Sequence, residues 1–224
     1  DVMAFGFGNN GVIVDQISKT FTATLSKDLL AKALENGLVY NFTFPMKKPG
    51  AVQLRVAVRD HASNKVGSAN QFVDVPNLKK KRLTLSGVVV ENISYEAWQK
   101  RSKGVADEQT SNPVGDTAQR RFKQGTVINY GSTIFNAKAA SIGQAGLVSQ
   151  VKLFLDGKLV FEGSPRPVVP GSDSAPGAIN LTGTLSLATK MTPGEYVLQI
   201  AITDPLAKEK YRTAYQFVQF EVIE

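Results

Sequence analysis

The sequence predicts an all-β chain that contains two β-sandwich domains in tandem. In the stretch 193–222, two runs of alternating apolar and polar residues, the pattern of half-buried strands, flank a short polar connection. The stretch 49–75 repeats this organisation, and the two stretches share nine identities over twenty-seven aligned positions when Lys210 is treated as an insertion. We therefore expect each domain to end in a hairpin made of its last two strands.

The repeat also sets the expected domain boundaries. The identities include Leu54 with Leu198 and Asp60 with Asp204, each at the same place in its hairpin. We expect a first domain over 1–76, shortened at its N-terminal side, and a second domain over 77–224. The basic run at 79–82 then belongs to a solvated linker.

One short helix interrupts the strands of the first domain. After a loose entry over 1–14 we expect a strand over 15–25, then a helix capped by Ser26 and stopped at Asn36-Gly37. A strand over 38–46 follows before the terminal hairpin. A helix in this place is a common way to cross from one sheet of a sandwich to the other.

The second domain contains the clearest hairpin of the chain, at 148–163. Asp156-Gly157 predicts a two-residue type I′ turn. That turn places Leu153 opposite Val160 and puts apolar side chains on both faces, so we expect the hairpin to be buried on both faces or docked on a neighbour. Further strands are expected over 83–90, 125–136 and 179–187.

The composition excludes several classes of active site. Cysteine is absent and histidine occurs once, which removes disulfides, thiolate metal sites and most Ser-His-Asp chemistry. Phosphate-binding loops, dinucleotide-binding glycine motifs, zinc spacings and EF-hand loops are absent from the sequence. We therefore expect no enzymatic activity, no cofactor and no metal, and we assign Asp60 and Asp204 to turn capping.

An irregular stretch over 91–122 carries the candidate binding residues. Loops of this length in compact domains are usually functional or mobile. Trp98, the only tryptophan, invites a binding role, but it equally fits a side chain that staples the loop onto the sandwich. The candidate contacts for a partner are two aromatic and four basic residues: Tyr95, Trp98, Lys100, Arg101, Arg120 and Arg121.

The net charge of +7 permits attraction to an acidic partner or to anionic headgroups at a membrane surface. The spacing of basic and aromatic residues does not assemble a stacking surface for single strands, so nucleic acid is not an expected partner.

Several stretches carry a family resemblance, among them PGAVQLRVAVRD, VKLFLDGKLVFEG and PGEYVLQIAITD. They closely resemble the region C-terminal to the A domain in von Willebrand factor A-related proteins, which are abundant in acidobacteria. The resemblance covers most of the chain from about Lys47. It implies an exported protein whose A domain lies outside this sequence, and a tail of two immunoglobulin-like or fibronectin III-like sandwiches.

These observations favour a non-enzymatic interaction or scaffold module that binds another protein through sandwich edges or through the 91–122 loop. Two alternatives stay open. One is a carbohydrate-binding module, which needs a coplanar set of exposed aromatic residues. The other is an accessory subunit of an envelope or membrane-bound complex.

Overall fold

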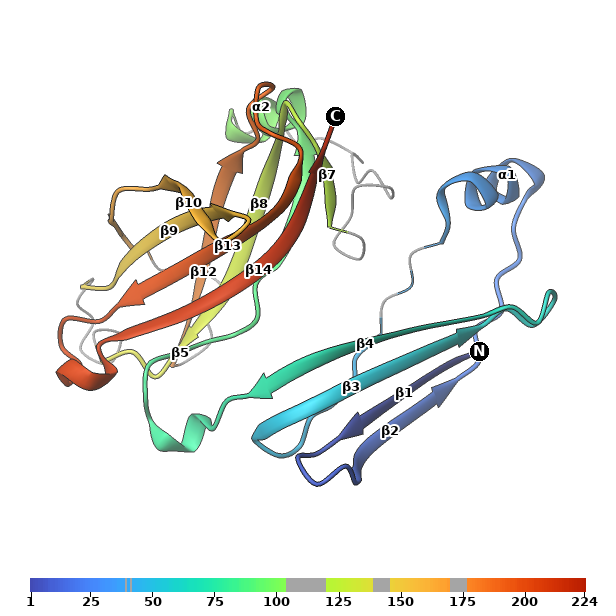
Figure 1. Ribbon diagram of the computed structural model, residues 1–224, viewed down its shortest axis with the longest axis horizontal. Helices are drawn as coiled ribbons and strands as arrows, with labels where there is room; N and C mark the ends of the chain where they lie inside the picture. Colours follow the sequence, from blue (N-terminus) through green and yellow to red (C-terminus); the bar gives the residue numbers. More distant parts are fainter. Residues whose placement is uncertain (39, 41, 104–119, 139–145, 170–176) are drawn as a thin grey trace. The chain divides into compact units, whose positions relative to one another are not determined.

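The computed structural model describes residues 1–38, 40, 42–103, 120–138, 146–169 and 177–224, without the side chains of residues 35, 36 and 101. Strands dominate it, in agreement with the expected all-β class (Figure 1). The chain divides into two compact units, Asp1–Lys80 and Lys81–Glu224. We call them unit 1 and unit 2 and describe each by itself.

Unit 1 contains one antiparallel sheet with the strand order β2-β1-β3-β4. Its strands are β1 (Val2–Phe7), β2 (Ile13–Lys19), β3 (Gly50–Arg59) and β4 (Val66–Val75). The expected loose entry over 1–14 is therefore wrong, because β1 pairs with both β2 and β3 inside the sheet. The signal was present in the sequence: Val2 and Ala4 alternate with more exposed residues and are buried.

Helix α1 (Lys27–Asn36) begins and ends where the sequence predicts. The Ser26 hydroxyl accepts a hydrogen bond from the Leu29 amide, and Gly37 ends the helix at a φ of 77°. The predicted strand after it is wrong for the described residues of 38–46, which form no strand. Their aromatic rings pack instead: the Tyr40 ring lies 3.7 Å, centroid to centroid, from that of Phe21, and Phe44 lies against Gly6.

The described residues of unit 1 bury little apolar surface. Its buried hydrophobic residues are Val2, Ala4 and Val52, whereas Leu34 is 80% exposed and Phe72 is 65% exposed. A second sheet facing the first, as a sandwich requires, is not found among them. The short 3-10 helix η1 (Leu78–Lys80) closes the unit.

Unit 2 contains two sheets that enclose one core. The larger sheet has the order β10-β9-β13-β14-β7, with β11 also paired to β9; the other has the order β12-β8-β5, with β6 also paired to β8. The strands are β5 (Thr84–Leu85), β6 (Val89–Ser94), β7 (Arg121–Lys123), β8 (Thr126–Phe135), β9 (Val148–Leu155), β10 (Lys158–Glu162), β11 (Arg166–Pro167), β12 (Ala178–Ser186), β13 (Gly194–Thr203) and β14 (Thr213–Ile223). Inward-facing side chains of both sheets, such as Ile128, Ile134, Leu198 and Ile200, are fully buried in this core. Unit 2 is thus a β-sandwich.

Both predicted terminal hairpins are confirmed. Strands β3 and β4 pair along their whole length, and so do β13 and most of β14. Figure 1 shows each hairpin within its own unit. In β13, alternate residues from Tyr196 to Ile202 are buried, which confirms the face assigned from the sequence.

The β9–β10 hairpin confirms part of the prediction. Asp156 and Gly157 both have positive φ, 50° and 75°, as a type I′ turn requires. Leu153 pairs with Phe161 rather than with Val160, because a bulge interrupts β10 between Leu159 and Phe161. Every residue of β10 is exposed, so the hairpin is not buried on both faces. The other expectation is confirmed: the hairpin docks on a neighbour, because β9 pairs with β13 along its whole length.

Candidate functional site

The first candidate site surrounds helix α2 (Tyr95–Ser102), which directly follows β6. The Ser94 hydroxyl accepts a hydrogen bond from the Ala97 amide and so caps the helix at its start. Ala97 packs with Ile93 and Val127 in a small cluster separate from the main core, and Trp98 packs against this cluster. Trp98 is half-buried there, as the stapling alternative requires.

Tyr95 and Trp98 are brought together, but not as a flat platform. Their ring centroids lie 5.5 Å apart and their planes are tilted by 32°. Tyr95 is 46% exposed. A carbohydrate-binding surface of coplanar rings is therefore not present at this pair.

The basic candidates are dispersed. Lys100 is exposed on α2, and the side chain of Arg101 lies outside the description. The Arg121 Nε donates a hydrogen bond to Glu221 Oε2 at 2.6 Å, and the Arg120 carbonyl accepts one from the Glu221 amide. These two arginines thus help to hold β7 against β14. Residues 104–119 of the predicted loop lie outside the described residues.

A second candidate site, which the sequence reasoning missed, is a cavity of about 570 Å³ in unit 2. It lies between β9 and β10 of one sheet and β8 and β12 of the other, at the edge where β10 and β12 are the outermost strands. Its apolar walls include Val151, Leu153, Leu155, Phe161 and Leu185. The available signal was the apolar pattern on both faces of the 148–163 hairpin.

Nine of the eighteen residues that line the cavity are polar, most of them serine, threonine or tyrosine. Tyr130, Arg166 and Lys190 contribute to its lining. Burial raises the pKa of the Tyr130 hydroxyl, and the positive charge of Arg166 acts in the opposite direction, so the guanidinium lies within electrostatic reach of the phenol. Among the described residues, neither Arg166 nor Lys190 forms an ion pair.

Gly183 determines the position of Tyr130. The two residues are paired directly across β8 and β12. A Cβ atom built on Gly183 would meet the Tyr130 hydroxyl oxygen at 2.1 Å, so the ring covers the backbone of the glycine. Only glycine at this position allows the tyrosine ring to lie across the strand and form a wall of the cavity.

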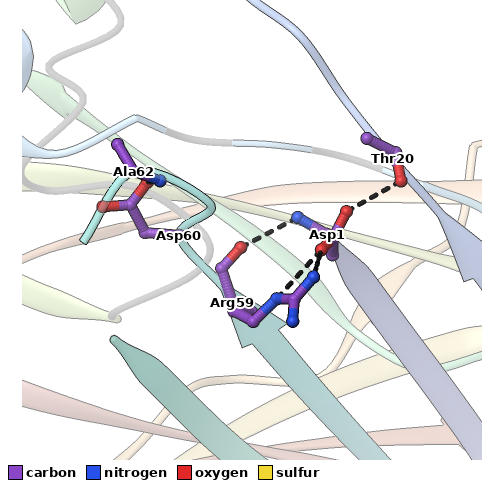
Figure 2. A network of polar contacts seen from close by, with 5 residues as sticks. All are labelled: Asp1, Thr20, Arg59, Asp60 and Ala62. Carbon is purple, nitrogen blue, oxygen red and sulfur yellow. Dashed lines mark hydrogen bonds and ion pairs between the residues drawn. The ribbon is translucent and has the colours of Figure 1, made fainter. Parts of the chain in front are cut away.

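Unit 1 contains a polar network that joins three separate segments of the chain (Figure 2). The Arg59 guanidinium at the end of β3 donates to the Asp1 carboxylate, and the Thr20 hydroxyl donates to the same carboxylate at 2.8 Å. The Asp1 amino group donates to the Arg59 carbonyl, also at 2.8 Å. Because the network is exposed, we interpret it as a surface tie that aligns strand ends.

Asp60 and Asp204 both cap turns. Asp60 accepts hydrogen bonds from Ala62 and Ser63 in an exposed turn (Figure 2 shows Asp60 beside Ala62). Asp204 is fully buried and accepts from the amides of Lys138 and Leu206 at 2.5 and 3.0 Å. Across the described residues, His, Asp and Glu side chains form no group of three that could hold a metal ion. None of the described helices has the length and apolarity needed to span a membrane.

No protein-family model matches the sequence, and no curated protein matches it either. A solved structure from Bacteroides vulgatus ATCC 8482, described as a candidate bacterial DNA-binding protein, is similar at 11% sequence identity. The similarity covers 88% of this chain and 76% of that chain, with a TM-score of 0.21. A similarity this weak supports no statement about fold or function.

Proposed function

We propose that this chain is a non-enzymatic interaction module that binds another protein by adding a strand to the outer edge of β12, along residues 181–186. The observation that carries the proposal is the composition and position of β12. It pairs only with β8 among the described strands, it runs from Ala178 to Ser186, and it contains neither a charged residue nor a proline. Charged residues, prolines and bulges are the usual means by which edge strands avoid pairing with other chains.

The opposite sheet shows the contrast. Its edge strand β10 is shorter, carries a bulge and has charged residues at both ends, Lys158 and Glu162. On β12, the outward side chains of Asn180, Thr182 and Thr184 are small, polar and exposed. A partner strand along β12 would gain backbone hydrogen bonds for affinity, with side-chain contacts adding specificity.

The proposal also covers the location of the protein and the kind of protein to which this chain belongs. We place the chain in an exported bacterial protein, as the tail region of a von Willebrand factor A-related protein with two immunoglobulin-like or fibronectin III-like domains, of which the described part of unit 1 contributes one sheet and unit 2 both. The support is the sequence resemblance together with the hairpin that closes each unit. The Tyr95–Trp98 pair and the basic residues beside it take a secondary role, because Trp98 is engaged in packing and Arg121 in an ion pair.

Hydrogen exchange tests the proposal once a partner has been captured from the native cell envelope. Only every second amide of an edge strand points away from its neighbour, so strand addition should protect alternate amides of β12. A Thr182→Lys substitution should weaken capture about tenfold, whereas the matched Gln219→Lys substitution on the exposed face of the interior strand β14 should leave it unchanged. Equal capture by the Thr182→Lys variant, with protection confined to other strands, would reject the β12 edge as the contact.

A further inference from the structure

The cavity between the sheet edges of unit 2 has aliphatic side chains on both walls and two cations in its lining. Its interior side chains, Val151, Leu153, Leu155 and Leu185, come from strands of both sheets. The described lining contains two cations, Arg166 and Lys190, and no carboxylate. We propose that this cavity binds a free amphipathic carboxylate of the fatty-acid type, with its chain between the sheets and its headgroup at Arg166.

The size and shape of the cavity fit a small ligand. A volume of about 570 Å³ lies within the range of roughly 300–1,000 Å³ that is common for small-molecule sites. Such sites combine apolar walls with polar groups that fix the orientation of the ligand. The bulge in β10 contributes to the wall, because it lets the consecutive residues Val160 and Phe161 both line the cavity.

The positive charge in the lining of the cavity favours a ligand with an anionic headgroup. Arg166 lies in β11 and is exposed, and Lys190 lies exposed in the connection that follows β12. Arg166 is paired with Ser149 at one end of β9, whereas the segment that carries Lys190 is bonded through the Thr192 carbonyl to Tyr196, which pairs with Leu155 at the other end. Arg166 forms no ion pair with a described residue and is the cation that we assign to the headgroup. An arginine fork binds a carboxylate through two parallel hydrogen bonds, and the Tyr130 hydroxyl, within electrostatic reach of Arg166, can donate another.

The aliphatic side chains on the walls of the cavity favour a ligand with an apolar chain. Aliphatic side chains on both walls remove an apolar chain from water, and each buried methylene adds to binding. A second protein strand would need its backbone groups satisfied inside this space, whereas an acyl chain has none to satisfy. The proposal is independent of strand addition at β12, so either can fail without the other.

Titration with sodium laurate below its micelle concentration tests the site in the whole chain. We expect saturable binding by calorimetry, with methyl NMR shifts at Val151, Leu153 and Leu155. The variant Arg166→Gln should bind laurate about tenfold more weakly or worse. The control variant Lys123→Gln loses the same charge from an exposed position that does not line the cavity, and should bind as the original chain does.

Two further measurements separate the apolar and charged parts of the site. Ala188→Trp places a large side chain at an exposed lining position and should abolish binding without entering the core. The methyl ester of laurate lacks the negative charge and should bind far more weakly than laurate. Absence of saturable binding, methyl shifts outside the cavity, equal binding of the ester, or equal losses in the Arg166→Gln and Lys123→Gln variants would each overturn the proposal.

Discussion

Asp60 and Asp204 occupy equivalent positions in the repeat, but their environments differ. Each follows the first strand of its hairpin and accepts backbone hydrogen bonds, as the sequence led us to expect of turn caps. Asp60 is exposed, whereas Asp204 is completely buried and also holds the Lys138 amide from another segment. The repeat therefore predicts the local role of both residues, but it does not predict the long-range contact of Asp204.

We expect Asp204→Ala to destabilise unit 2 by about 1–3 kcal/mol, because it leaves two amides, those of Lys138 and Leu206, without their acceptor. Denaturant unfolding followed by circular dichroism measures the loss. Asp60→Ala is the matched control, with a smaller expected effect because water can replace the lost acceptor. Equal losses in the two variants would contradict the role given to burial.

Asp60 should also make the stability of unit 1 depend on pH. Hydrogen bonds from the Ser63 side chain, and then from the Ala62 and Ser63 amides, lower the pKa of Asp60 below its ordinary value of 3.8. A carboxyl with a lowered pKa in the folded state stabilises that state above the unfolded pKa, and the contribution is lost as pH falls through the folded pKa. Ser63→Ala should raise the Asp60 pKa towards its ordinary value in an NMR titration, and an unchanged pKa would show that the hydroxyl is not the main cause.

At the scale of elements, the two terminal hairpins share sequence but differ in register. The connection spans 60–65 in unit 1 and 204–212 in unit 2, three residues longer, although the alignment requires only one insertion. As a result Leu54 pairs with Gln71, whereas Leu198 pairs with Val218, two positions beyond the aligned residue Gln216. A shift of two keeps every side chain on its original face, which is why the alternation predicted both hairpins correctly.

The elements that sequence reasoning misjudged depend on long-range pairing. Strand β1 has only a short local signal, the alternation of Val2 and Ala4, and it is completed by the partners on its two sides. The described residues of 38–46 form no strand, and the Tyr40 ring packs against that of Phe21. The cavity likewise needs β9, β10 and β12 to be placed in two sheets. Local signals such as the Ser26 cap and the Asp156-Gly157 turn were sufficient for local features.

The contact between Gly183 and Tyr130 gives a prediction for strand β12. Gly183→Ala should destabilise unit 2 by roughly 1–3 kcal/mol, because the new methyl group forces the Tyr130 ring to move. In a Tyr130→Ala background the same change should cost little, and a double-mutant cycle by thermal unfolding measures this coupling. Gly67→Ala in β4 is the control, since a Cβ atom there meets nothing within 4 Å. Additive effects in the cycle would contradict the contact.

At the scale of the whole molecule, the two units share a hairpin pattern but bury its apolar face to different extents. The aligned positions Leu198 and Ile202 of unit 2 are fully buried beneath its second sheet. In unit 1, Leu54 is half-buried and Val58 is 49% exposed. The repeat predicts which face of each hairpin is apolar, but the packing layer above that face comes from other segments.

This difference predicts unequal costs for the same substitution. Leu198→Ala should destabilise unit 2 by about 2–5 kcal/mol through lost burial and a cavity, whereas Leu54→Ala should cost unit 1 less because its site is already partly open to water. Trp98 is the only tryptophan and lies in unit 2, so fluorescence during denaturation follows that unit. We expect Leu198→Ala to move the fluorescence midpoint to lower denaturant and Leu54→Ala to leave it in place. For Leu54→Ala we expect hydrogen exchange to show a loss of amide protection that is confined to unit 1. An equal shift of the Trp98 fluorescence transition by both variants would instead show that the chain unfolds as one cooperative unit.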